Sequence, residues 1–177
     1  MKYSREQLID RIRQTARSIG FPEQVAIAQL ARESANFRDE VVYGPFVGGS
    51  GERGLAQFIP GTWARFGAGM HQAAYDPDAS LAAWARYTSY LASLFGGDLV
   101  KILEGYNGGE GNVQRNTVSS AAKRYASEIL AQAGQVSNVA PNSITSANSL
   151  FDFSQWGLKQ WAMVGIAGLL IFALLDD

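Results

Sequence analysis

The chain has 177 residues, enough for one catalytic-sized domain plus an appendage. Charged residues make up 18% of it, below the usual ~25%, so a long uncharged stretch is expected somewhere. Its net charge of −1 excludes a global basic field, so we expect no nucleic-acid partner. The absence of cysteine excludes disulfides and thiol nucleophiles, and a single histidine cannot form a cluster, so we expect neither a metal nor a cofactor.

Residues 1–134 hold nearly all the charge and show the periodicity of a mainly α domain. Ser4 and Gln7 form a capping box that predicts a helix over 4–20. Residues 38–54 are glycine-rich and predict a loop, where a small β-hairpin is the one departure from helix that the pattern allows. The same reasoning predicts further helices over 22–34, 60–66, 77–95, 99–106 and 117–133.

Two further segments are expected after this domain. Residues 135–155 are rich in Ser and Asn, lack any sustained period and predict a flexible linker. Residues 156–175 are almost entirely apolar, and 20 helical residues span roughly 30 Å, about one hydrocarbon core. Trp156 and Trp161 fit an interfacial aromatic belt, which favours a single transmembrane helix; a buried core helix is the alternative.

Glu33 is the first candidate for chemistry. It lies at the C-terminal end of an otherwise apolar helix, where the negative end of the helix dipole disfavours a carboxylate. Burial among apolar groups acts in the same direction. A carboxyl that stays protonated near neutral pH is suited to act as a general acid on a glycosidic bond. The alternative is a surface ion pair with Arg32 or Arg53.

Three motifs in order extend this observation. They read ESANF from residue 33, GLAQFIPGT from residue 54 and GYNGG from residue 105. With their spacing they resemble the motifs of the soluble lytic transglycosylase family over roughly residues 20–130. Tyr125 also falls where that pattern has a similar residue. The resemblance implies a lysozyme-like helical fold and cleavage of peptidoglycan.

The resemblance also implies roles for individual residues. Glu33 would act first as acid and then as base, cutting the MurNAc–GlcNAc β-1,4 bond and leaving a 1,6-anhydro ring. Tyr106 would be catalytic by bonding to Glu33 and fixing its position. The expected substrate-binding residues are Ser34, Gln57, Phe58 and Asn107. From the residues alone, a buried tyrosine at position 106 and a satisfied loop amide at position 57 are the alternatives.

Departures from the family pattern leave alternatives open. Ala56 stands where the family usually has Met, which suggests a wider subsite, and Gly105 and Gly108 replace alanines, which suggests a looser turn. A goose-type lysozyme hydrolysing the same bond would need a second carboxylate, for which the 38–54 loop offers Asp39, Glu40 and Glu52. A non-catalytic membrane protein that binds peptidoglycan is the third possibility.

The predicted anchor suggests a location. The first residues lack the apolar stretch of a signal peptide, and the layout is similar to virion-membrane transglycosylases of internal-membrane bacteriophages. The expected partners are peptidoglycan strands, a lipid membrane through residues 156–175, and virion capsid or membrane proteins. A bacterial enzyme of a secretion or conjugation machine is the alternative.

Overall fold

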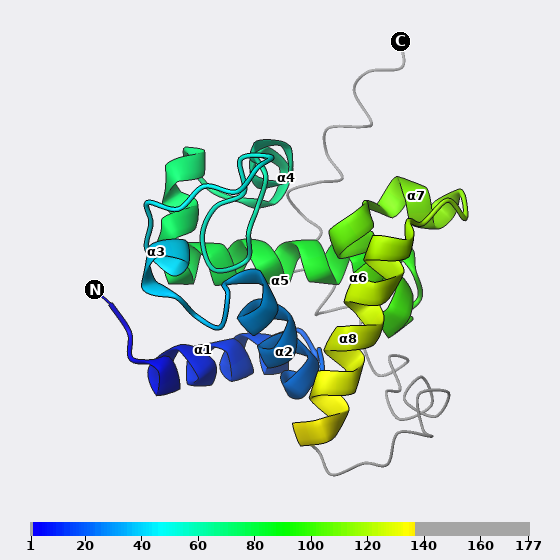
Figure 1. The fold of residues 1–177 in the computed structure, drawn as a ribbon, viewed down its shortest axis with the longest axis horizontal. Helices are drawn as coiled ribbons and strands as arrows, with labels where there is room; N and C mark the ends of the chain where they lie inside the picture. Colours follow the sequence, from blue (N-terminus) through cyan, green and yellow to red (C-terminus); the bar gives the residue numbers. More distant parts are fainter. Residues whose placement is uncertain (1, 137–177) are drawn as a thin grey trace.

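The computed structural model describes residues 2–136, which form a mainly helical domain (Figure 1). No helix within these residues is long and apolar enough to cross a membrane. The linker predicted over 135–155 and the transmembrane helix predicted over 156–175 lie, apart from the first two linker residues, outside the described residues. The elements are α1 Arg5–Ser18, α2 Glu23–Glu33, α3 Asp39–Val42, α4 Pro60–Phe66, the 3-10 helix η1 His71–Tyr75, α5 Pro77–Leu94, α6 Leu99–Gly108, α7 Glu110–Gln114 and α8 Ser120–Val136.

Side-chain caps begin three of the predicted helices. The Ser4 hydroxyl accepts from the Gln7 backbone N–H, and the Gln7 side chain accepts from that of Ser4, which confirms the predicted capping box of α1. Asp76 and Asp98 accept from backbone N–H groups in the first turns of α5 and α6. Each cap satisfies a donor that the helix itself leaves free, which is why local sequence alone located these starts.

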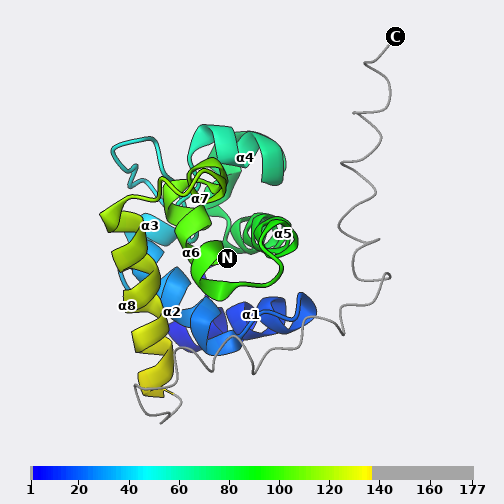
Figure 2. The same cartoon turned by 90° about the vertical axis from the view of Figure 1, so that its right-hand side faces the viewer.

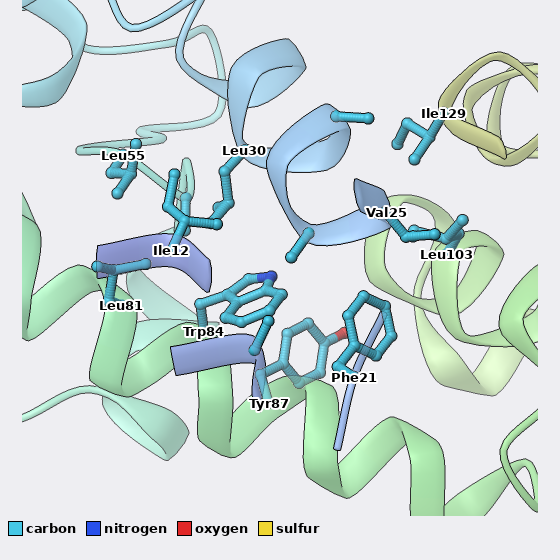
Figure 3. Close-up of a cluster of buried hydrophobic side chains, with 14 of the residues drawn as sticks. Ile12, Phe21, Val25, Leu30, Leu55, Leu81, Trp84, Tyr87, Leu103 and Ile129 are labelled. Atoms are coloured by element: carbon cyan, nitrogen blue, oxygen red, sulfur yellow. The ribbon is translucent and has the colours of Figure 1, made fainter. Parts of the chain in front are cut away.

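Helix α5 runs through the middle of the domain, with α1, α4 and α6 packed around it (Figures 1 and 2). Helix α2 lies between α1 and α8. The core gathers around Trp84, which is fully buried and meets the Phe21 ring edge-on at 5.6 Å between centroids. Figure 3 shows Leu30 of α2, Leu103 of α6 and Ile129 of α8 in the same cluster. This core fixes the C-terminal end of α2 relative to α6 and α8.

The loop predicted over 38–54 contains a helix rather than a hairpin. Its first part forms α3, because Val41 and Val42 bury one side of that turn against the domain. The described residues contain no strand; the nearest feature is one isolated antiparallel bridge between Arg53 and Phe58. The expected hairpin is therefore wrong. The short helices η1 and α7 were also not predicted, since neither is long enough to show a period.

Gly105 and Gly108 permit close packing rather than a loose turn. A Cβ on Gly105 would lie 2.8 Å from the Phe95 ring, and one on Gly108 would lie 2.9 Å from the Cβ of Ala122. Both glycines are part of α6, which packs against α8. The expectation of a loosened turn is therefore wrong, because neighbouring side chains fill the space that the missing methyl groups would occupy.

Candidate active site

Glu33 is the last residue of α2, and its carboxylate accepts a hydrogen bond from the Tyr125 hydroxyl of α8. Burial raises the pKa of Glu33 to about 7. The Tyr125 hydrogen bond and the charge of Arg32 oppose that rise, whereas the charge of Glu52 adds to it. Near neutral pH both the acid and the base form of the carboxyl are therefore populated. Such a group can first donate a proton and then accept one.

Neither basic residue proposed as an ion-pair partner of Glu33 takes that position. Arg32 forms a salt bridge with Glu128 of α8, and its guanidinium lies over the Tyr125 ring, 5.3 Å from the centroid. Arg53 donates to the Gln72 side chain at 3.0 Å. The surface ion pair considered for Glu33 is therefore absent from the described residues, and Arg32 acts on its carboxylate through its charge alone.

The chain leaves α2 through an unusual turn. Ala35, Asn36 and Phe37 have φ between +50° and +66°, a left-handed conformation that costs energy for residues with a side chain. The buried Ser34 hydroxyl donates to Leu30 O at 2.6 Å and accepts from the Phe37 N–H at 3.0 Å. Ser34 thus holds the turn that follows Glu33. Its predicted contact with substrate stays a prediction, although the hydroxyl is already bonded within the protein.

The Tyr106 hydroxyl does not bond to Glu33. It donates to Ala56 O at 2.7 Å, across the 50 residues that separate α6 from the loop before α4. Burial raises the pKa of Tyr106 well above its usual value, and the charge of Glu33 adds to the effect, so the two groups lie near each other. The predicted Glu33–Tyr106 hydrogen bond is therefore corrected: Tyr125 makes it, because α8 packs directly on α2.

The GLAQF segment is held by the protein on several sides. Gln57 has φ +48°, and its side-chain amide donates to Gly54 O at 2.8 Å. Phe58 is 2% exposed and packs near the rings of Trp63, Tyr87 and Tyr106. Ala56 is fully buried, which gives its small side chain no face on a subsite. Gln57 and Phe58 thus shape this loop, and their predicted substrate contacts stay predictions.

Among the four predicted substrate-binding residues, Asn107 is the one with an exposed side chain. It follows Tyr106 on α6, at the start of the turn of chain that leads into α7. Its amide could meet a sugar without moving any buried group. Its predicted contact with substrate stays a prediction.

Two functional candidates had little or no signal in the sequence. Tyr125 matched the family pattern but had no assigned role, since nothing in the sequence shows which helix α8 would contact. Gln29 lies four residues before Glu33, hence on the same face of α2, and is 1% exposed. A polar amide in a buried stripe was the available signal for Gln29.

Comparison with known proteins places this geometry in a family. The model of the transglycosylase SLT domain matches residues 11–150. A crystal structure of the lytic transglycosylase Slt from Pseudomonas aeruginosa, an inactive glutamate-to-glutamine mutant, superposes with a TM-score of 0.60 and 25% sequence identity. The match covers 77% of this chain and 25% of that one, so the chain spans about a quarter of that structure's length. No curated protein sequence matches significantly. By its motifs, its helical fold and the extent of the family match, the chain belongs to the transglycosylase SLT domain family.

Proposed function

We propose that the domain is a peptidoglycan lytic transglycosylase that cuts the β-1,4 bond between N-acetylmuramic acid and N-acetylglucosamine. The observation that carries the proposal is Glu33: a carboxyl at the end of α2 with its pKa raised to about 7 by burial and a single neutral hydroxyl bonded to it. Membership of the SLT family and the likeness to a lytic transglycosylase support the same activity.

In the proposed reaction Glu33 protonates the glycosidic oxygen, and the bond from that oxygen to the anomeric carbon breaks. The C6 hydroxyl of the muramic residue then attacks the anomeric carbon, and its proton passes to the Glu33 carboxylate. The product carries a 1,6-anhydro ring, no water is consumed, and Glu33 returns to its acid form. A pKa near 7 suits both steps, since neither form of the carboxyl is strongly disfavoured.

Digestion of purified peptidoglycan followed by mass analysis tests this proposal. Anhydro ends produced by the wild type, and lost in Glu33→Gln, would support it. Undiminished wall clearing by Glu33→Gln would instead favour a non-catalytic wall-binding protein.

Hydrolysis of the same bond, as in goose-type lysozymes, is a second candidate function. It needs a second carboxylate, and Glu52 could supply it. Of the three loop carboxylates considered, Asp39 pairs with Lys2 and Glu40 pairs with Arg38. Glu52 accepts from the Ser50 backbone N–H at 2.8 Å, and its charge acts on Glu33. It is thus the candidate that could hold a water molecule. Reducing ends among the products that disappear in Glu52→Gln would establish hydrolysis.

We further propose that residues 156–175 anchor the domain to a lipid membrane, on the basis of the uncharged run over 161–175. Full-length protein should then sediment with lipid vesicles, whereas a truncation after residue 136 should stay in solution and remain folded and active. A soluble full-length chain beside an aggregating truncation would mean that the segment packs on the domain instead.

The anchor leads to a proposed setting. We propose that the enzyme resides in the internal membrane of a bacteriophage virion, in contact with other virion proteins, and opens the wall locally during genome delivery. Virions carrying Glu33→Gln should adsorb normally but deliver their genome late. Unaltered delivery would favour the bacterial secretion or conjugation setting.

A further inference from the structure

A chain of buried polar side chains leads from α5 to Glu33. The Trp84 indole N–H donates to the Gln29 side-chain oxygen at 3.2 Å. Gln29 lies one turn before Glu33 on α2, against which α8 packs, and its side chain acts on the Tyr125 hydroxyl by lowering its pKa; Tyr125 donates to Glu33. Trp84, Gln29 and Tyr125 are 0%, 1% and 4% exposed, so no solvent water competes for these groups. Figure 3 shows Trp84 beneath α2, with its indole nitrogen on the side of that helix.

The chemistry of these groups allows one direction for the chain. An indole N–H can only donate, so the Gln29 side chain must turn its oxygen toward Trp84. Its NH₂ group is then the part of the side chain that can act on the phenol oxygen as a donor, which accounts for the lowering effect that Gln29 has on the pKa of Tyr125. Because an amide NH₂ cannot accept, the Tyr125 proton is left to point at Glu33.

We propose that Gln29 is a positioning residue for the general acid: held in one orientation by Trp84, it makes the Tyr125 hydroxyl a donor to Glu33 and fixes the carboxyl for reaction. This inference rests on the proposed function only in taking Glu33 as the reacting group. Gln29 itself touches no substrate and acts through Tyr125. This role explains why the buried face of α2 contains a polar side chain at position 29.

The other groups that face Glu33 come from several elements. Arg32 of α2 lowers its pKa, Glu52 of the 38–54 loop raises it, and Tyr106 of α6 is neutral and nearby. Glu128 of α8 forms a salt bridge with Arg32. None of these groups bonds to Gln29, so its replacement should change one contribution alone: the Tyr125 hydrogen bond, which lowers the pKa of Glu33.

The test is a titration of Glu33 by carbon-13 NMR of its labelled carboxyl, in the full chain without substrate. Gln29→Met keeps the side-chain length and removes both amide groups. Without them Tyr125 can turn its proton elsewhere, so the midpoint of Glu33 should move to higher pH. In turnover assays the alkaline limb should move the same way, and kcat should fall on the order of tenfold with KM unchanged.

Matched variants separate positioning from mere packing. Thr88→Val alters a buried α5 residue whose hydroxyl has no partner within the described part of the chain, so it should leave the Glu33 midpoint unchanged. Tyr125→Phe should raise the midpoint, and adding Gln29→Met to it should raise it no further. If Gln29→Met fails to fold, pairing it with Trp84→Phe removes the unpaired indole N–H.

A folded Gln29→Met protein whose Glu33 titrates at the wild-type midpoint would overturn the inference, as would a further shift in the double variant. The titration needs no activity, so a protein without turnover but with the expected shift would sink the proposed function and leave this inference standing. If the wild type is active but Gln29→Met leaves the Glu33 midpoint unchanged, the proposed function stands and this inference fails.

Discussion

The domain contains two tyrosine–glutamate pairs that differ in burial and in whether a cation bonds to the carboxylate. In the first, Tyr125 donates to Glu33 and no cation bonds to that carboxylate. In the second, the Tyr87 hydroxyl proton is shared between Gly105 O at 3.3 Å and Glu110 at 3.4 Å, and Arg65 also donates to Glu110 at 2.8 Å. Burial raises the pKa of Glu33 to about 7, whereas burial of Glu110 is outweighed by Arg65, by its own backbone and by Tyr87, so that its pKa is lowered.

The difference indicates that a tyrosine partner does not by itself set the direction in which the pKa of a glutamate shifts. A hydroxyl stabilises a carboxylate only modestly, whereas a bonded guanidinium keeps it charged at every physiological pH. At Glu33 the nearest guanidinium, that of Arg32, is held by Glu128. Arg32 therefore lowers the pKa of Glu33 through its charge but forms its ion pair with Glu128.

The largest effect is expected on turnover, which should differ between variants of Glu33 and Glu110. Glu33→Gln should lower turnover by on the order of 10²–10⁴-fold or more, because the amide can neither give nor take the proton. Glu110→Gln should stay within a few-fold of wild type. Both are measured on purified peptidoglycan, with circular dichroism to confirm folding. Equal losses would remove the distinction drawn between the two pairs.

The stability of the domain should depend on pH through Glu33. The pKa of Glu33 is raised above its unfolded value, so its neutral form costs nothing at low pH and the penalty grows as pH rises from about 4.5 to about 7. Glu33→Gln should therefore be more stable than wild type at pH 8 by up to about 3 kcal/mol, with the gain vanishing near pH 4.5. Urea unfolding at both pH values measures it. A gain that does not depend on pH would show that Glu33 is not the titrating group.

Tyr106→Phe tests the corrected hydrogen bond. Loss of the hydroxyl leaves Ala56 O unpaired, which should destabilise the domain by about 0.5–1.5 kcal/mol and lower activity by loosening the loop beside Glu33. Tyr87→Phe removes a hydroxyl that bonds to Gly105 O and Glu110 instead, so it is the matched control and should keep its activity. Thermal unfolding and kinetics of both variants decide whether Tyr106 serves the site or only the core: a stability loss with normal activity would show the latter.

The smallest effect is expected from removing the cation of the second pair. Arg65→Met should raise the pKa of Glu110, because the bonded guanidinium is what outweighs burial there. The side chain of Arg65 is 54% exposed, so the loss of stability should stay below about 1 kcal/mol. NMR titration of the Glu110 carboxyl checks the direction; an unmoved pKa would show that the backbone contact, and not Arg65, holds it down.

Local sequence was enough to predict where most helices lie and which carboxyl is the candidate acid. Capping side chains such as Ser4, Asp76 and Asp98 act within one turn of chain, so their effect can be predicted without the fold. Glu33 was found because its place at the end of an apolar helix is also a local property. The family motifs around it are likewise short runs of neighbouring residues.

Which side chains meet could not be predicted before the helices were seen packed together. Tyr125 lies 92 residues from Glu33 and reaches it because α8 packs on α2, whereas Tyr106, the nearer choice by motif, bonds to Ala56. Gln29 acquires its partners from α5 and α8 at once. Val41 and Val42 formed a helix where glycines suggested a hairpin, because they could bury one face against the core. Such contacts depend on how distant helices pack, which no local pattern records.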